Sequence, residues 1–493
     1  MYFLGVDNGL TRTRSVVLNL ESASLVALSE VSHDVVDGLP AGQLEQDPAQ
    51  WIRAVDRTVR HCLEQLGETR HRVAGIGICG QPRGMVLLDG DHRLVRPAKL
   101  AADRSATPES EEISRAFGGP PGMIELTGNS MSPAEVAAKL LWVKRHEPDH
   151  FREVKTLLMP HDFVNYWLTG VKRTEFSEAS QTGLLDVRRR CWSPELVNFI
   201  DPALSEMLVP VKSSCEPHGQ LRRELATGWG LSEDILVSAG GSNEMMGALG
   251  AGSVSPGTGA VSLAGAAGLQ VVCERPRIDP RGDLAACCDL TDRWMLMTKG
   301  VQASPVLGEV QRYHGWNAAQ MLEALSSAPA GAGGLTFLPE NKRTGRKGML
   351  AGIDGGNLTP ANMARAAIEA VALELGTGLA RMRELGAEVA ELRLGGMSGA
   401  GGATRQILAD VLGVPIFSAR AEACAALGAA LQAAVTFFHL SGEDLTYSEI
   451  TSYAVEPDEA TRCEPGREGH AFYQELLGRR RAFGELLQDE GFC

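Results

Sequence analysis

The chain of 493 residues lacks any C-x-x-C pair, although it contains ten cysteines. Only Cys287 and Cys288 lie close together in the sequence. A disulfide framework or a zinc site is therefore not expected, and free thiols in a reducing cytoplasm are the simpler account.

The sequence also lacks an excess of positive charge. It has 47 Lys and Arg against 61 Asp and Glu, which gives a formal net charge of -14. Nucleic acids and anionic membranes favour a basic surface, so neither is an expected partner. A small phosphorylated ligand needs only a local positive site and stays compatible with this charge.

No stretch is apolar enough to suggest a membrane span. The longest apolar run, residues 423–438, is mostly alanine and contains Gln432, so it predicts a buried helix. The first twenty residues carry Asp7, Arg12 and Arg14, which a secretory signal would not tolerate. We therefore expect a cytoplasmic protein.

A chain of this length is expected to form two domains. Its central stretch, residues 237–252, reads V-S-A-G-G-S-N-E-M-M-G-A-L-G-A-G. An apolar strand runs into two glycines and then into a small-residue helix, which places Ser242, Asn243 and Glu244 where open α/β sheets carry their chemistry. The alternative is an ordinary strand-to-helix turn with Asn243 as the N-cap.

Residues 2–20 predict a β-hairpin, because two β-rich runs flank a turn of Asp7, Asn8 and Gly9. The turn brings a carboxylate together with the donors of Thr11, Arg12 and Arg14. Such a set can hold hydrated Mg²⁺ and a phosphate. A surface hairpin with solvated charges explains the same residues.

Other polar residues follow predicted strands. Gln81 and Arg83 stand in G-Q-P-R-G after the strand at 73–79, a suitable place to bind a polyol. Asp103 and Glu178 lie in later polar turns. Each acid, taken alone, fits a solvated side chain better than a ligand.

The helices and glycine loops complete the pattern. Periodicity predicts helices at 47–66 and along 368–379, and a capping box at Ser132 predicts a helix from there to His146. Residues 257–273 repeat the strand–turn–strand opening of the chain, a weak sign of two similar domains. A glycine loop follows at 395–402, and residues 441–493 are expected to form a helical extension.

This order of segments resembles the FGGY carbohydrate kinases, and among them the xylulokinases. The resemblance covers nearly the whole chain, and its most specific stretches are residues 5–14, 80–89, 139–148, 159–170, 188–193, 405–413 and 425–431. It implies an α/β protein of two actin-like (RNase H-like) domains, each with a mixed sheet flanked by helices, and a cleft between them. The implied domains are 1–240 on the sugar side and 241–493 on the nucleotide side.

The resemblance also implies roles by position, with ATP and Mg²⁺ as cofactors. Asp7 would organise Mg²⁺ and phosphates, and the ketose ligands would be Gln81, Arg83, Asp103 and Glu178. The nucleotide would contact Thr11, Arg12, Arg14, Gly265, Ala266, Gly268, Gly395, Gly396 and Gly399. Sugar and ATP are the expected partners, and a homodimer is an open expectation.

The departures from the family pattern fall on the chemistry. The family's Gly-Asp-Asn, whose Asp is the general base, aligns its Asp-Asn with Asn243 and Glu244. The family's Met-His at the sugar site is Pro82-Arg83 here. The two hydroxyl residues of the family's phosphate loop are replaced by Ala266 and Ala267, so this chain lacks both hydroxyls. An Asn amide is not basic enough to take the proton.

Three hypotheses follow from these residues. The first is a kinase that phosphorylates a ketopentose or related polyol, with Glu244 as a candidate base. The second is a non-catalytic homologue that binds sugar or nucleotide, and the third transfers to another acceptor or hydrolyses ATP. Because Arg83 can form a bidentate pair with an anion, we further expect a preference for acidic or phosphorylated sugars.

Overall fold

The computed structural model describes residues 1–263, 267–299, 303–339, 348–395, 401–419, 423–455 and 457–489. Two compact units make up the chain. Unit 1 comprises Met1–Val254, Val272–Met295 and Ala423–Glu456, and unit 2 comprises Ser255–Val271, Leu296–Glu422 and Pro457–Cys493. The boundaries of these units differ from those of the predicted domains, 1–240 and 241–493. The assignment of these domains to a sugar side and a nucleotide side stays a prediction.

Unit 1 is built on a seven-stranded mixed sheet in the order β13-β14-β5-β1-β2-β3, with β15 also paired to β5. Its strands are β1 (Tyr2–Asn8), β2 (Arg12–Asn19), β3 (Ser24–Ser32), β5 (Val73–Gly80), β13 (Gly219–Gln220), β14 (Leu236–Val237) and β15 (Gly241–Ser242). β1 and β2 pair antiparallel, which confirms the hairpin expected at residues 2–20, and β5 runs parallel to β1.

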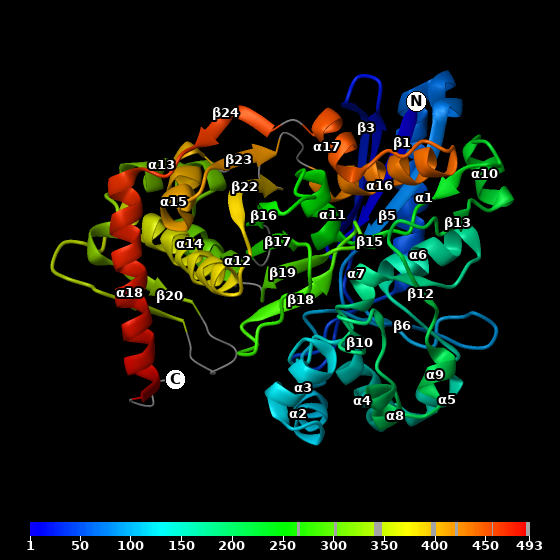
Figure 1. The fold of residues 1–493 in the computed structure, drawn as a ribbon, viewed down its shortest axis with the longest axis horizontal. Helices are drawn as coiled ribbons and strands as arrows, with labels where there is room; N and C mark the ends of the chain where they lie inside the picture. Colours follow the sequence, from blue (N-terminus) through cyan, green and yellow to red (C-terminus); the bar gives the residue numbers. More distant parts are fainter. Residues whose placement is uncertain are drawn as a thin grey trace. The chain divides into compact units, whose positions relative to one another are not determined.

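Helices cover both faces of this sheet (Figure 1). On one face, α1 (Pro48–Leu66) and α6 (Pro160–Thr169) share a buried apolar cluster with the large side chains of β1 and β5. The Asp47 carboxylate accepts a hydrogen bond from the Ala49 N–H and caps α1 where the sequence predicted its start. The other face of β1 and β5 packs against α16 (Cys424–Leu440), which confirms the buried helix expected at 423–438.

Glycine makes this second packing close. A Cβ on Gly5 would lie 1.9 Å from the Ala426 carbonyl oxygen, and one on Gly77 would lie 1.9 Å from that of Ala429. Because side chains alternate along a strand, Gly5 of β1 and Gly77 of β5 face α16, while the large residues next to them in sequence face α1. Backbone thus meets backbone beside the central strands.

The remaining helices of unit 1 are α2 (Thr107–Ala116), α3 (Gly119–Thr127), α4 (Val136–His146), α5 (Pro148–Glu153), α7 (Phe176–Ala179), α8 (Pro194–Ile200), α9 (Leu204–Met207), α10 (Arg223–Trp229), α11 (Asn243–Gly250) and α17 (Tyr447–Ala454). The helix expected from Ser132 begins four residues later, at Val136. The reason is that the Ser132 hydroxyl donates to the Glu135 carboxylate and caps no backbone N–H.

Unit 2 contains most of a second seven-stranded sheet, in the order β18-β19-β17-β16-β22-β23-β24. Its strands are β16 (Gly257–Ser262), β17 (Gly268–Cys273), β18 (Leu284–Cys288), β19 (Trp294–Thr298), β22 (Val389–Gly395), β23 (Ile416–Ala419) and β24 (Pro457–Cys463). β16 pairs antiparallel with β17 and parallel with β22, as β1 does with β2 and β5. The internal repeat suggested by the two hairpins is confirmed.

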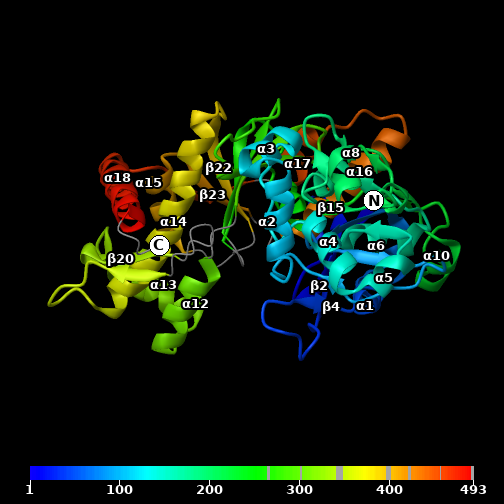
Figure 2. The same cartoon turned by 90° about the horizontal axis from the view of Figure 1, so that it is seen from below.

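Helices α14 (Pro360–Glu384), α15 (Gly402–Leu412) and α18 (Arg467–Asp489) lie side by side in unit 2 (Figures 1 and 2). The shorter helices α12 (Ala303–His314) and α13 (Ala318–Ser327) both pack against α14. The expectation of an all-helical extension at 441–493 is wrong at β24, which pairs antiparallel with β23. Pairing along an open sheet edge outweighs the weak strand propensity of P-D-E-A-T-R-C.

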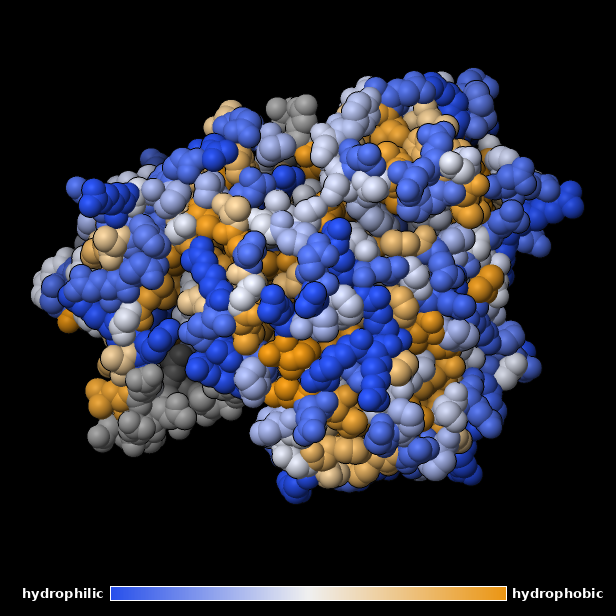
Figure 3. All heavy atoms as spheres, in the orientation of Figure 1, coloured by the Kyte–Doolittle hydropathy of each residue, from blue (hydrophilic) through white to orange (hydrophobic). Residues whose placement is uncertain are grey.

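The face shown in Figure 3 mixes hydrophilic and hydrophobic side chains. In the described part of the chain, no helix has the length and apolar character that crossing a membrane requires.

Candidate active site in unit 1

Asp7 lies near the end of β1, opposite Arg14 of β2. Its carboxylate accepts a hydrogen bond from the Asn243 side chain, and the Cys79 thiol lies 3.6 Å from Oδ1. Burial raises the pKa of Asp7 to about 6, against these two hydrogen bonds and the charges of Arg14 and Arg12. The group is therefore ready to accept a cation or a proton near neutral pH.

Asn243 and Glu244 are the first two residues of α11. Ser242 is the N-cap, and its hydroxyl oxygen accepts the Met245 N–H at 3.3 Å. Successive helical residues point about 100° apart. Asn243 accordingly bonds Asp7, whereas the charge of Glu244 acts on Arg83. Glu244 Oε2 is buried and has no hydrogen-bond partner among the described residues.

Both backbone polar groups of Arg83 are hydrogen-bonded to side chains. Its N–H donates to Glu178 Oε1 at 2.8 Å, and its carbonyl accepts from Lys139 Nζ at 2.7 Å. The residue has a φ of 57°, in the left-handed region that side chains other than glycine rarely occupy. Such backbone strain costs on the order of 1–3 kcal/mol and persists where surrounding contacts impose it.

The charges of several carboxylates act on the Arg83 guanidinium. Burial alone would lower the pKa of Arg83, but the charges of Glu244, Glu135 and other neighbours outweigh it and raise that pKa. Burial lowers the pKa of Lys139 to about 7, so this second cation only partly offsets the nearby acids. Arg83 is therefore already compensated in the absence of a ligand.

Glu178 lies on α7 and is fully buried. Burial raises the pKa of Glu178 to about 8, although His161 and the Arg83 N–H act in the opposite direction. Its Oε1 accepts from Arg83, while Oε2 finds no partner within the described residues. Near neutral pH this group is mainly a neutral carboxylic acid, which can donate as well as accept a hydrogen bond.

The other two predicted sugar ligands have structural partners. Gln81 Nε2 donates to Gln46 Oε1 at 2.9 Å. Asp103 is fully buried, and its carboxylate accepts four hydrogen bonds, from Leu44 N, Lys99 Nζ, Ser105 N and Ser105 Oγ. Since these bonds occupy both oxygens, we do not include Asp103 among the sugar ligands proposed below.

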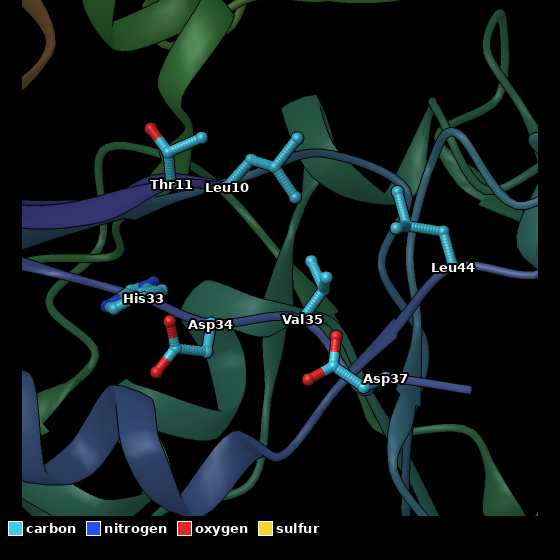
Figure 4. A pocket seen from close by; sticks show the side chains of 7 residues that line it. All are labelled: Leu10, Thr11, His33, Asp34, Val35, Asp37 and Leu44. Carbon is cyan, nitrogen blue, oxygen red and sulfur yellow. The ribbon is translucent and has the colours of Figure 1, made fainter. Parts of the chain in front are cut away.

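The hairpin residues predicted to contact phosphate have neighbours of their own, although the charges of Arg14 and Arg12 also act on Asp7. Arg12 and Arg14 both pair with Glu30 of β3, at 3.2 and 2.8 Å. Thr11 lines a pocket of about 330 Å³ together with His33, Asp34, Asp37 and the apolar side chains of Leu10, Val35 and Leu44 (Figure 4). Two aspartates beside Thr11 disfavour a phosphate in this pocket.

In unit 2, the ends of the two predicted nucleotide loops meet. Gly268 and Gly395 flank the same residue of β16, Ser262, one on each side. Gly265, Ala266, Gly396 and Gly399 lie outside the described residues. Their predicted contacts with the nucleotide stay predictions.

Sequence reasoning placed Ser242 beside the predicted chemistry but did not assign Gln181 or Lys139 to the site. Gln181 lies in the turn that follows α7, where its N–H donates to the Glu178 carbonyl at 2.9 Å, so its closeness in sequence to Glu178 could have revealed it. Lys139 lies in a stretch that resembles the family, but its contact with the Arg83 carbonyl joins residues 56 positions apart. No periodicity in the sequence encodes such a contact.

Arg83, Glu178 and Glu244 together offer one buried cation and two acids with free hydrogen-bonding capacity. The Arg83 guanidinium offers N–H donors, and the unpartnered oxygens of Glu178 and Glu244 offer acceptors. A hydroxyl group can donate and accept at once, so a chain of hydroxyls matches this alternation.

The two mixed sheets, with the same strand order, are those of an actin-like ATPase fold. The family model for the N-terminal domain of the FGGY family of carbohydrate kinases matches residues 2–250, and that for the C-terminal domain matches residues 273–437. The chain belongs to this family, whose members use ATP as phosphate donor, and it is a carbohydrate kinase.

Known relatives agree with this assignment. The chain is 29% identical over 473 residues to a xylulose kinase of Haemophilus influenzae, covering 91% of this chain and 96% of the relative. It is 31% identical over 438 residues to a xylulose kinase of Escherichia coli, covering 87% and 88%. The crystal structure of a xyloylose kinase from Brucella ovis matches with a TM-score of 0.90 and 27% identity, covering 99% and 100%. These comparisons support an active kinase and give no support to the non-catalytic alternative.

Proposed function

We propose that this carbohydrate kinase transfers the γ-phosphoryl group of ATP to a hydroxyl of a neutral ketopentose, such as xylulose, or of a related polyol. The names of the similar proteins support the substrate class. The observation that carries the proposal is a buried Arg83 guanidinium on which the charges of Glu244 and Glu178 act, while each of these acids keeps one buried oxygen without a partner among the described residues. Arg83, Glu178 and Gln81 would bind the hydroxyls.

The expectation of an acidic or phosphorylated sugar is revised on electrostatic grounds. It assumed a free Arg83, whereas Glu244, Glu135 and Glu178 already act on this guanidinium. An anionic ligand would have to lie near the carboxylates of Glu244 and Glu135, and like charges at short range in a buried site repel strongly.

Glu244 is the proposed general base. Asn243, in the family's base position, has its amide bonded to Asp7 and has no proton affinity to offer. Glu244 carries a buried oxygen without a partner, next to the proposed sugar ligand Arg83. In this arrangement Arg83 orients the acceptor hydroxyl and Glu244 takes its proton as the phosphoryl group transfers.

Mg²⁺ would accompany ATP at Asp7. Within the described residues, no group of three or more His, Cys, Asp or Glu side chains could hold a metal ion. A single buried carboxylate fits Mg²⁺ that keeps its waters and is carried mainly by the nucleotide phosphates. Free cysteines throughout the described chain and the use of ATP support work in the cytoplasm. A homodimer stays a prediction.

Replacing Glu244 tests this function directly. Wild type should phosphorylate D-xylulose or another neutral ketopentose with ATP and Mg²⁺, and Glu244→Gln should lower kcat by at least about a hundredfold, the usual contribution of a general base. Asn243→Asp alone should change kcat little, because the base lies one residue further on. Single-turnover phosphorylation is the measurement.

Glu224→Gln, an exposed acid of α10, is the matched control and should keep full activity. A wild type without transfer to any neutral ketose or polyol would refute the proposed reaction. A Glu244→Gln enzyme with wild-type kcat would refute the base and leave the reaction standing.

A further inference from the structure

Gln181 joins two parts of the candidate active site that are distant in the sequence. Its Oε1 accepts from Arg83 at 3.1 Å, and its Nε2 donates to Ser242 Oγ at 3.1 Å. The side chain is only 3% exposed, so no water competes for these bonds. Residues 83, 181 and 242 thereby form one hydrogen-bonded row within unit 1.

The direction of this row is set by chemistry. A guanidinium can only donate hydrogen bonds, so the amide oxygen of Gln181 must face Arg83 and its NH₂ group must face Ser242. A turned amide would bring its NH₂ group against the guanidinium and lose the bond to Arg83. Gln181 therefore has one allowed orientation.

At the other end of the row, Ser242 is the N-cap of α11. Its hydroxyl oxygen accepts from Met245 N as well as from Gln181. A cap residue sets where the first helical turn begins and how it is rotated. Asn243 and Glu244 are in that turn, so a shift of Ser242 would move both.

We propose that Gln181 is a positioning residue, which holds Glu244 in place for proton transfer by tying the N-cap of α11 to Arg83. The residue that binds the acceptor hydroxyl and the residue that takes its proton are then fixed in one geometry. Gln181 itself touches neither proton nor phosphate in this scheme. The inference rests on the proposed function, because it requires Glu244 to be the base.

The row explains why a polar side chain is buried at this place. Burying an amide costs free energy unless it is hydrogen-bonded, and Gln181 makes one bond in each direction. Reaction rates depend steeply on geometry, since displacement of a reacting group by about 1 Å can cost on the order of a hundredfold. A link of two hydrogen bonds is thus enough to matter for kcat.

A double-mutant cycle tests the row. Gln181→Leu keeps the volume and removes both bonds, and Ser242→Gly breaks the row while keeping a good N-cap residue, at a stability cost of only a few tenths of a kcal/mol. Each variant should lower kcat by roughly ten- to a hundredfold and leave KM for ATP unchanged. The double variant should be no slower than the slower single variant, because both break the same link.

Thr182→Val is the matched control. Its hydroxyl is buried one residue away and donates only to the Ala179 carbonyl, outside the row. This variant should melt at a lower temperature and keep the wild-type kcat. Gln181→Leu should also melt at a lower temperature, because it leaves the buried Arg83 N–H without its partner, but of the two variants it alone should lower kcat strongly.

Several outcomes would overturn the proposal. Effects on kcat that multiply in the double variant would show that Gln181 and Ser242 act independently. A rise in KM for the sugar at unchanged kcat would show that Gln181 serves binding through Arg83 alone. If Gln181→Leu does not fold, Ser242→Gly with unchanged kcat is sufficient to refute the row.

Failure of the proposed function looks different. In that case wild type itself transfers no phosphoryl group to a neutral ketose, or Glu244→Gln keeps full kcat. Wild-type activity that depends on Glu244, together with active Gln181→Leu and Ser242→Gly variants, would refute only the positioning role.

Discussion

Glu178 illustrates how burial sets the chemistry of one residue. Its pKa is raised to about 8 from the ordinary 4.5, so the folded protein retains a proton that the unfolded chain releases. The contribution of Glu178 to stability therefore falls as pH rises between about 4.5 and 8, because only in the unfolded state is the group deprotonated in that window, and this contribution is constant on either side.

Glu178→Gln should remove this dependence. The amide oxygen can still accept from the Arg83 N–H, and no carboxyl group is left to titrate. The variant should gain stability relative to wild type as pH rises from 5 to 8 and hold that gain above 8. Denaturant unfolding at pH 5, 7 and 8.5 measures it. Glu206→Gln, an exposed acid, should show a constant difference from wild type. A constant difference for Glu178→Gln would contradict the assignment.

At the scale of elements, α11 and α16 pack backbone to backbone. A Cβ on Gly250 of α11 would lie 1.8 Å from the Cys424 carbonyl oxygen, and one on Gly428 of α16 would lie 2.0 Å from that of Met246. These glycines are packing residues, because any side chain there would push the helices apart. The position of Glu244 on α11 depends on this contact.

Two glycines of the same helix offer a matched pair. Gly250→Ala should destabilise the protein by about 1–3 kcal/mol or more, as overpacking does. Gly247→Ala should stabilise it by roughly 0.5–1 kcal/mol, because alanine favours a helix interior and, among the described residues beyond the neighbouring backbone of α11, no atom lies within 4 Å of the added Cβ. Urea unfolding of both variants is the measurement. Equal effects of the two changes would contradict the close packing.

At the scale of the whole molecule, the proposed sugar ligands all belong to unit 1. D-xylulose should therefore bind without nucleotide and raise the free energy of unfolding, by about 2.7 kcal/mol at a hundred times its Kd. Thermal unfolding of the full chain measures this shift. D-gluconate at equal concentration should shift the melting temperature less, because its carboxylate would lie near those of Glu244 and Glu135. A larger shift with gluconate would contradict the revised substrate class.

The sequence predicted the elements whose signals are local. The Asp-Asn-Gly turn of residues 2–20, the capped helix after Asp47 and the alanine-rich run at 423–438 each carry their own pattern over adjacent positions. Their order along the chain was also enough to expect two similar domains and a resemblance to FGGY kinases. The expectations at Ser132 and at β24 failed because a side-chain contact and a sheet edge decided them.

The state of the candidate site was decided by the tertiary structure. From sequence, Arg83 and Asp103 were both expected as sugar ligands, because of their positions in the family resemblance. In the fold, the charges of Glu178 and Glu244 act on Arg83, and Lys139 donates to its carbonyl. The Asp103 carboxylate accepts hydrogen bonds from four donors. Charge compensation and hydrogen bonding act through space. The contacts of Arg83 with Lys139 and with Gln181 join residues that are 56 and 98 positions apart, and local sequence patterns cannot encode them.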